Sequence, residues 1–204
     1  IKKRLYLKLY KIMDDDELST GQIDKKFKFN IRKSGNIIYF YEHITQETIL
    51  ELKYIISELN EILLYDQNKY HSTPFIELHL YSYGGDCFMG LEGYSFIKNN
   101  KIPINTIIDG FIASSATFLF LGGQEKLIKE TSMMLIHQLS TSFQGRYEDL
   151  KDEFANSSNI MTVIKNIYLE NTKIRRKELD KILNRESMIT ATDILKYGLA
   201  DRMI

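Results

Sequence analysis

The chain has 204 residues, 44% of them hydrophobic, which is enough to bury a substantial core in one domain. Its 27 Lys and Arg residues balance its 27 Asp and Glu residues, so no net charge argues for binding to nucleic acid or a membrane surface. The apolar runs fall short of the ~20 residues of a membrane span, and we expect no signal peptide. A single cysteine, Cys87, cannot form an internal disulfide, which favours a reducing, cytoplasmic location.

The first 35 residues are predicted to form an N-terminal arm that precedes the domain at 36–204. They are polar and irregular, carry an acidic run at 14–17, and end at the turn Ser34-Gly35. Because the arm lacks the apolar periodicity of a core element, we expect it to be mobile or ordered by a partner.

Strands and helices alternate through the first half of the domain. Short apolar runs typical of strands lie at 36–41, 76–81 and 104–108. Helical patterns follow from Thr45 and from Asp86, both predicted N-caps, and from Ser114. A polar loop is expected at 66–74. This repeated βαβ order predicts an α/β fold with a mostly parallel sheet and right-handed crossovers.

The second half of the chain is predicted to be mainly helical. From Tyr147, apolar residues recur at helical spacing for about 24 residues, a length of roughly 36 Å. A helix of this length would protrude from so small a domain, so we expect it to pack against another subunit. A shorter helix is expected from Arg175 to Leu183. A last helix is expected to end at Tyr197-Gly198, because glycine is common at the position just after the end of a helix.

Two adjacent serines, Ser114 and Ser115, lie where an apolar strand gives way to an apolar helix. A hydroxyl at such a junction is held on a sharp turn, and the next backbone N–H groups point outward. His137 is a candidate base, and the pair Gly84-Gly85 closes another strand. Because ligands collect at the carboxyl ends of parallel strands, we expect the glycines and serines to meet at one edge of the sheet. This combination predicts acyl-transfer chemistry.

Several motifs of the chain occur in an order and spacing that resemble those of a known family. The motifs are Tyr83-Gly84-Gly85, the segments at 110–116, 134–138 and 143–145, and the C-terminal segments at 188–191 and 196–201. They are similar to those of ClpP, the proteolytic subunit of the Clp protease, from about residue 36 to the C-terminus. The resemblance implies the spiral of ββα units shared by ClpP and crotonases, with a protruding handle region at about 139–172.

The resemblance also implies roles for the residues of the predicted site. Ser114 matches the nucleophile, and His137 matches the general base that takes and returns its proton. The backbone N–H groups of Gly85 and Ser115 match the oxyanion hole, in which removing one donor typically slows the reaction ~100- to 1,000-fold.

The third member of the triad differs from the family pattern. Alignment on Ile189-Thr190-Ala191 puts Glu186 where the family has an aspartate. A glutamate can orient an imidazole, as it does in serine hydrolases of other folds, but its longer side chain moves the carboxylate. The hypothesis is therefore a triad of Ser114, His137 and Glu186, with Asn184 as the alternative group that orients the histidine.

The resemblance implies an assembly and partners as well. We expect a homo-oligomer of two stacked heptameric rings, a tetradecamer, with inter-ring contacts at Gln144, Gly145 and Arg185. Unfolded polypeptides would be the substrates, an ATP-driven unfoldase would supply them, and the subunit itself would need no metal or organic cofactor. Family members dock the ATPase at an aromatic pocket, whose aligned positions here carry Glu77 and His79. Docking in the family's usual manner is therefore in doubt.

Two other interpretations stay open at the level of sequence. One is a catalytically silent ring subunit or adaptor that keeps the fold and joins or modifies a host ring. The other is a crotonase-like acyl-CoA enzyme, which shares the fold and a backbone oxyanion hole but has no use for the pair Ser114 and His137.

Overall fold

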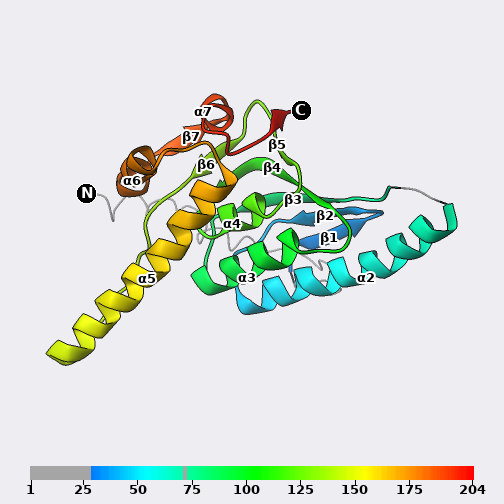
Figure 1. Ribbon diagram of the computed structural model, residues 1–204. Coiled ribbons are helices and arrows are strands. Elements are labelled where there is room, and N and C mark those ends of the chain that lie inside the picture. Colours follow the sequence, from blue (N-terminus) through cyan, green and yellow to red (C-terminus); the bar gives the residue numbers. More distant parts are fainter. Residues whose placement is uncertain (1–28, 71–72) are drawn as a thin grey trace, which may run out of the picture.

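The computed structural model describes residues 29–70 and 73–204 (Figure 1). The strands are β1 (Ile31–Ser34), β2 (Ile37–Phe40), β3 (Ile76–Ser82), β4 (Ile104–Ala113), β5 (Lys126–Ile128), β6 (Met133–Leu135), β7 (Met188–Thr190) and β8 (Arg202–Met203). They pair in the order β1-β2-β3-β4-β5-β8, and β6 joins β4 to β7. The pairs from β2 to β8 and the pair β4–β6 are parallel, which confirms the mostly parallel α/β sheet.

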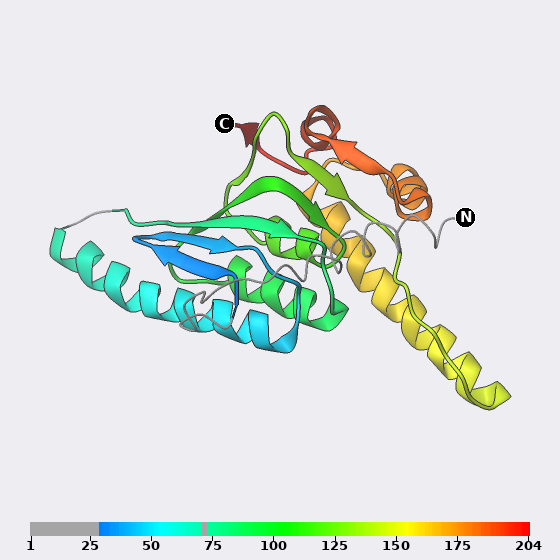
Figure 2. The ribbon, with the colours of Figure 1, turned by 180° about the vertical axis from the view of Figure 1, so that it is seen from behind.

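The helices pack mainly around this sheet. They are α2 (Gln46–Tyr70), α3 (Cys87–Lys98), α4 (Ala116–Leu121), α5 (Tyr147–Asn171), α6 (Arg176–Arg185) and α7 (Ala191–Lys196). Helices α2 and α3 lie side by side along one face of the sheet, as both views show (Figures 1 and 2). Helix α4 contacts β4 on one side and α5 on the other, so α4 connects the sheet to the longest protruding element.

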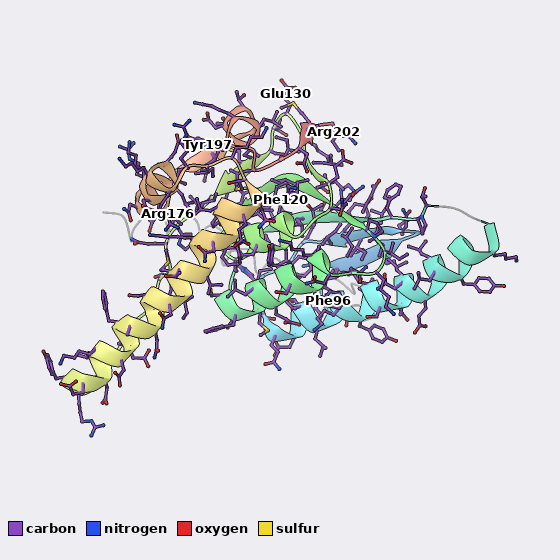
Figure 3. All side chains as sticks on the ribbon, in the orientation of Figure 1. Phe96, Phe120, Glu130, Arg176, Tyr197 and Arg202 are labelled. Atoms are coloured by element: carbon purple, nitrogen blue, oxygen red, sulfur yellow. The ribbon has the colours of Figure 1, made fainter. Side chains whose placement is uncertain are left out.

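The core lies between the sheet and these helices. Along β3, alternate residues face it and are fully buried, namely Ile76, Leu78 and Leu80, whereas Glu77 and His79 lie on the opposite face. Phe120 of α4 points into this core (Figure 3). Two predicted caps are confirmed, because the Thr48 N–H donates to Thr45 Oγ1 at 3.2 Å and the Met89 N–H donates to Asp86 Oδ1 at 2.9 Å.

The N-terminal boundary of the domain is a correction. Residues 31–34 were expected in the arm, but they form β1, which pairs antiparallel with β2. Ile31 is buried there, and this one apolar contact together with the ladder of hydrogen bonds draws a polar segment into the sheet. The rest of the predicted arm, residues 1–28, lies outside the described residues.

Two further boundaries differ from the predictions. Helix α2 continues to Tyr70 through the segment expected to be a loop, because no glycine or proline interrupts it before Pro74 and polar residues do not end a helix. Strand β4 continues past Ile108 to Ala113. Gly110, with φ of 85°, lies where the pairing with β3 shifts register, so the strand bends at the glycine and does not end there.

Helix α5 confirms the predicted long helix, with 25 residues. Its buried residues are Ile164, Ile167 and Tyr168, all in its C-terminal half, which packs against α4 and α6. The N-terminal half extends away from the body of the molecule (Figure 1). In the described part of the chain, no helix combines the length and hydropathy needed to cross a bilayer.

Candidate active site

Two glycines follow the end of β3, in backbone conformations that residues with a side chain rarely adopt. Gly84 has φ of 89° and Gly85 has φ of 151°, and a Cβ at Gly85 would lie 2.2 Å from the Ile44 carbonyl oxygen. The Ile44 N–H donates to the Gly84 oxygen at 2.9 Å, and the Asp86 N–H donates to the Ile44 oxygen at 2.8 Å. These two bonds flank Gly85 and do not use its N–H.

Ser114 occupies a strained turn between β4 and α4. Its φ of 56° is in the left-handed region, which a side chain with a Cβ seldom adopts. The Ser114 N–H donates to the Leu135 oxygen at 2.9 Å, and a Cβ on Gly84 would lie only 2.6 Å from the Ser114 Cβ. The following residue, Ser115, is the N-cap position of α4, where the first backbone N–H groups have no acceptor within the helix.

His137 follows β6 and is held by a backbone carbonyl. Its Nδ1 lies 2.6 Å from the Gln138 carbonyl oxygen, and because a carbonyl can only accept, Nδ1 carries the proton in this bond. In the neutral ring, Nε2 is then the basic nitrogen. That Nε2 is buried, and within residues 29–70 and 73–204 it has no hydrogen-bond partner. The ring is therefore held in the tautomer that a general base for a hydroxyl requires.

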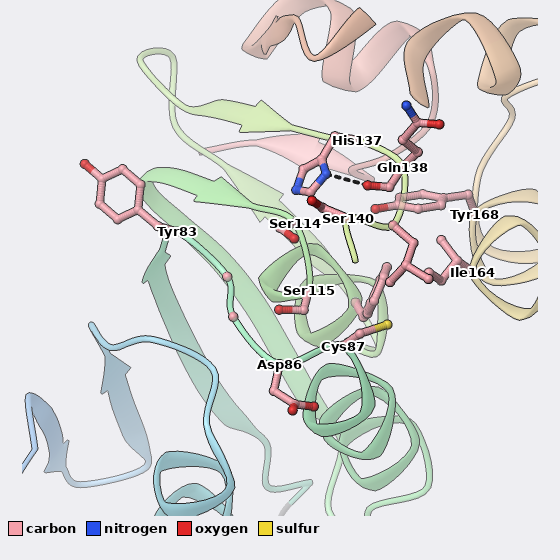
Figure 4. A pocket seen from close by; sticks show the side chains of 14 residues that line it. Tyr83, Asp86, Cys87, Ser114, Ser115, His137, Gln138, Ser140, Ile164 and Tyr168 are labelled. Carbon is pink, nitrogen blue, oxygen red and sulfur yellow. Dashed lines mark hydrogen bonds between the residues drawn. The ribbon is translucent and has the colours of Figure 1, made fainter. Parts of the chain in front are cut away.

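A pocket of about 350 Å³ collects these groups (Figure 4). Its lining includes Gly84, Gly85, Ser114, Ser115 and His137, so the strand ends meet at one edge of the sheet. Among the described residues, no hydrogen bond joins Ser114 Oγ to His137 Nε2. In the absence of substrate, catalytic hydrogen bonds are often long or misaligned and tighten when substrate binds.

Glu186 lies outside the pocket. It is exposed at the C-cap of α6, with φ of 50°, and in the described chain no hydrogen bond or ion pair joins it to His137. The antiparallel pairing of β6 with β7 sets Leu135 opposite Met188. Beyond these strands the pairing shifts, because the Gln138 N–H donates to the Leu183 oxygen at 3.1 Å, so His137 and Glu186 lie on neighbouring segments but are not a register pair. Asn184, the alternative orienting residue, is also exposed.

The residues expected at inter-ring contacts lie on the surface. Gln144 and Gly145 are exposed just before α5, and Arg185 is exposed at the end of α6. The exposed part of α5 carries large apolar side chains, among them Tyr147 and Phe154, which are 71% and 73% exposed. Apolar side chains on a protruding helix are typical of a surface that another molecule covers.

The structure adds groups that the sequence analysis did not assign to the site. The Gln138 carbonyl is a backbone group, so no residue pattern could have revealed it. Tyr168 reaches the pocket from α5, and only its position on the apolar face of that helix hinted at burial. Cys87 also lines the pocket, but burial and, to a lesser degree, the neighbouring Asp86 raise the pKa of its thiol. A raised pKa disfavours the thiolate and so a catalytic thiol.

A second polar cluster lies on the open face of the sheet. Asp109 accepts hydrogen bonds from Tyr41 at 2.5 Å, from Lys129 at 2.5 Å and from His79 Nδ1 at 2.9 Å. Burial alone would raise the pKa of Asp109, but these hydrogen bonds, led by that from His79, outweigh it and hold the pKa well below its usual range. The hydrogen bond to Asp109 raises the pKa of His79 against the effect of burial. Glu77 and His79, which align with the family's ATPase-docking pocket, also interact with each other: His79 Nε2 lies 3.5 Å from Glu77 Oε2. These two positions are therefore occupied by polar groups that have partners within the chain.

Comparisons with known proteins agree with this architecture. The family model described as Clp protease matches residues 33–204. The ATP-dependent Clp protease proteolytic subunit of Cyanophora paradoxa is 28% identical over 189 residues, which cover 90% of this chain and 93% of the relative. The subunit of the same description from Deinococcus radiodurans is 26% identical over 159 residues, 77% of each chain.

A solved structure shows the same fold. A mutant of ClpP1 from Listeria monocytogenes superposes with a TM-score of 0.72 and 18% sequence identity, and the match covers 83% of this chain and 91% of that one. At this identity the likeness concerns the fold.

Proposed function

The chain belongs to the Clp protease family, and from this premise we propose that it is a serine endopeptidase subunit that cleaves unfolded polypeptides. One observation carries the proposal: Ser114 and the unpartnered Nε2 of His137 line the same pocket, together with Gly85 and Ser115. A nucleophile, a base in the right tautomer and two backbone amides beside the nucleophile are the groups that acyl transfer requires.

The proposed reaction uses these groups in sequence. His137 Nε2 takes the proton of Ser114 Oγ as the oxygen attacks the peptide carbonyl, and the oxygen of the tetrahedral intermediate accepts hydrogen bonds from the Gly85 and Ser115 amides. The imidazolium then gives its proton to the departing amine, and an acyl ester remains on Ser114. Water attacks this ester with His137 again as base, which releases the acid and restores the serine. No step needs a metal ion or organic cofactor.

Glu186 is proposed as the acid that stabilises the imidazolium. The pairing of β6 with β7 supports this role because it brings the segments that carry His137 and Glu186 side by side. For Glu186 to stabilise the imidazolium, its carboxylate must replace the Gln138 carbonyl as the hydrogen-bond acceptor of His137 Nδ1. A carboxylate interacts with an imidazolium more strongly than a carbonyl does, so this exchange would favour the protonated state formed during catalysis.

We also propose that the active form is a double heptameric ring in the cytoplasm, served by an ATP-driven unfoldase. The exposed apolar side chains in the N-terminal half of α5 support an interface there, with Gln144 and Gly145 at its start. Arg185, exposed at the end of α6, is proposed as a further contact between rings. A closed chamber would explain how an unselective site spares folded proteins. The polar Glu77 and His79 indicate that the unfoldase contact differs from the aromatic pocket of the family.

Covalent labelling tests this proposal directly. The full chain is treated with a fluorophosphonate probe, the labelled peptide is identified by mass spectrometry, and cleavage of a fluorogenic peptide is measured in parallel, with S114A as control. We expect a label on Ser114, turnover by the wild type and neither in S114A. Native mass spectrometry of the same sample is expected to show fourteen subunits. An unlabelled wild type would contradict the proposed activity.

A silent ring subunit is the second candidate, and one observation favours it. In the described part of the chain, no hydrogen bond joins the His137 imidazole to Ser114 Oγ or to Glu186. If this geometry persisted in the assembly, the fold would be retained without activity. Rings of fourteen that take up no label would support this candidate, whereas labelled rings would exclude it.

A further inference from the structure

A buried chain of hydrogen bonds connects α5 to the strained turn of Ser114. The Ser114 carbonyl oxygen accepts from the Thr117 N–H at 3.0 Å and from the Thr117 hydroxyl at 2.6 Å. The same hydroxyl lies 2.5 Å from the hydroxyl of Tyr168. Thr117 and Tyr168 are 0% and 1% exposed, so water does not compete for these bonds.

The direction of the bonds follows from the valence of the groups. The Ser114 carbonyl can only accept, so the single proton of the Thr117 hydroxyl points to it. Thr117 Oγ1 must then accept from Tyr168, whose O–H donates. Burial raises the pKa of the Tyr168 phenol above its usual range, so it keeps this proton at any physiological pH. The order is Tyr168 O–H to Thr117 Oγ1–H to the Ser114 carbonyl.

We propose that Thr117 and Tyr168 are positioning residues that hold Ser114 in its reactive conformation. The inference rests on the proposed function, because it assigns these residues to the same nucleophile. Ser114 needs such support because its φ of 56° is unfavourable for a residue with a side chain. Two hydrogen bonds to its carbonyl fix the peptide plane that follows, and that plane carries the Ser115 N–H of the oxyanion hole.

Tyr168 is well placed to anchor this chain. Its ring packs edge-on against Phe118 of α4, with centroids 6.0 Å apart, and it lies in the buried half of α5. The other half of α5 is the protruding part with exposed apolar residues. A displacement of α5 would therefore move the Tyr168 hydroxyl and loosen the Ser114 turn, which links the nucleophile to whatever covers the protruding helix.

A purely structural role would act through the ring of Tyr168, not through its hydroxyl. The two roles are separated by substitutions that remove single oxygen atoms. T117V removes both bonds of the threonine hydroxyl, T117S keeps the hydroxyl, and Y168F removes only the outer donor. The double variant T117V/Y168F tests coupling: once the hydroxyl of Thr117 is gone, the hydroxyl of Tyr168 has no path to Ser114.

The experiment measures the rate of fluorophosphonate labelling of Ser114 in the full chain, together with kcat and KM for a fluorogenic peptide. We expect T117V to lower the labelling rate and kcat about tenfold or more, with KM within about twofold, and Y168F to lower them by about threefold. T117S should restore the wild-type rate. The double variant should match T117V, which marks the two residues as one unit.

A matched control removes another buried tyrosine hydroxyl that binds α5. The Tyr94 hydroxyl accepts from Asn171 Nδ2 at 2.9 Å and so ties the end of α5 to α3, away from the pocket. Y94F should leave the labelling rate unchanged. The melting temperature of every variant is recorded, so that a loss of folding is distinguished from a loss of positioning. If T117V does not fold, the comparison of Y168F with T117S and the wild type tests the proposal.

The outcomes separate this inference from the proposed function. Labelling of the wild type with unchanged rates in T117V and Y168F overturns the inference alone. Equal losses in Y94F and Y168F, or additive losses in the double variant, also overturn it. A wild type that takes up no label overturns the proposed function and this inference with it.

Discussion

At the scale of single residues, a backbone carbonyl, and not a carboxylate, holds His137 in the tautomer that the proposed base requires. The Gln138 carbonyl holds Nδ1 and leaves Nε2 basic, so the tautomer does not depend on Glu186. A carbonyl has no charge, however, and in the proposed mechanism it gives little stabilisation to the imidazolium that would form when Ser114 attacks. The need for a carboxylate therefore belongs to the transition state, not to the resting site.

The substitution E186Q tests this reasoning. If Glu186 joins the site during catalysis, we expect kcat to fall by about 100-fold with little change in KM, because only the charged state of His137 loses a partner. The measurement is steady-state cleavage of the fluorogenic peptide, with S187A, at the neighbouring exposed position, as the matched control. Wild-type turnover in E186Q would mean that Ser114 and His137 act as a dyad.

The pair His79 and Asp109 predicts a pH dependence of stability. The pKa of His79 is raised in the folded state, so its contribution is fully present below the unfolded value near 6.5 and is lost as pH rises through the folded value. The pKa of Asp109 is lowered, so its contribution is present above the unfolded value and is lost only as pH falls through the folded one. Between these limits the pair stabilises the fold.

We therefore expect the free energy of unfolding of the wild type to fall as the pH rises from the unfolded His79 pKa near 6.5 through the raised folded pKa. The decrease should be absent in H79Q, which cannot take up the proton, and weaker in D109N, which removes the partner carboxylate. Urea unfolding at several pH values measures the free energy of unfolding of the wild type and of both variants. A wild-type curve that rises over this interval, or an H79Q curve of the same slope, would refute the assignment.

At the scale of elements, α3 approaches the N-terminus of α4 closely, beside the Ser115 amide of the proposed oxyanion hole. A Cβ on Gly90 would lie 2.6 Å from the Ser115 Cβ and 2.9 Å from the Ser115 carbonyl oxygen. Gly90 has no unusual backbone conformation, so the reason for a glycine there is space and not φ. Helix α3 can approach the N-terminus of α4 only because this position has no side chain.

The substitution G90A tests the contact between α3 and α4. Alanine favours a helix, but the clash with Ser115 requires a backbone shift that typically costs about 1–3 kcal/mol, which exceeds the gain of about 1 kcal/mol in helix propensity. We expect a lower free energy of unfolding and slower labelling of Ser114, because the shift moves the Ser115 amide. S95A, at an exposed position of the same helix, should change neither. A more stable G90A would show that the two helices separate without cost.

At the scale of the whole molecule, α5 has two halves with different environments. Its C-terminal half is built into the domain through Ile164, Ile167 and Tyr168. Its N-terminal half exposes Phe154 and Tyr147 almost completely, which is costly for an isolated chain and suits a covered surface. The proposed stacking of rings would bury exactly the part that the monomer leaves open, so assembly and stability of this half are expected to be coupled.

The substitution F154E tests the proposed stacking. A carboxylate at the centre of an apolar interface loses its water without a partner, so we expect the assembly of fourteen subunits to separate into single rings or smaller species. Native mass spectrometry measures the shift. D152N, a neighbouring exposed position, should leave the assembly intact, and the melting temperature should show that the F154E domain still folds. An unchanged F154E assembly would place the contact elsewhere.

Local chemistry explains which features were predictable. Asp86 and Thr45 begin helices because their side chains accept bonds from nearby backbone amides, and the pattern of apolar residues after Tyr147 is enough to indicate a long helix. The boundaries at Ser34, Tyr70 and Ala113 were missed. Each depends on a partner strand or on the absence of a breaker, which local patterns represent poorly.

The sequence by itself determined the α/β order of elements, the family and the position of Ser114 at a strand–helix junction, because these depend on short-range periodicity and on motif spacing. Only the tertiary structure decided which groups meet there. It placed the Gln138 carbonyl at Nδ1 of His137 and kept Glu186 on the surface. It also joined Tyr168 to Ser114 through Thr117. These contacts link distant segments or backbone atoms, and packing of the whole chain sets their distances.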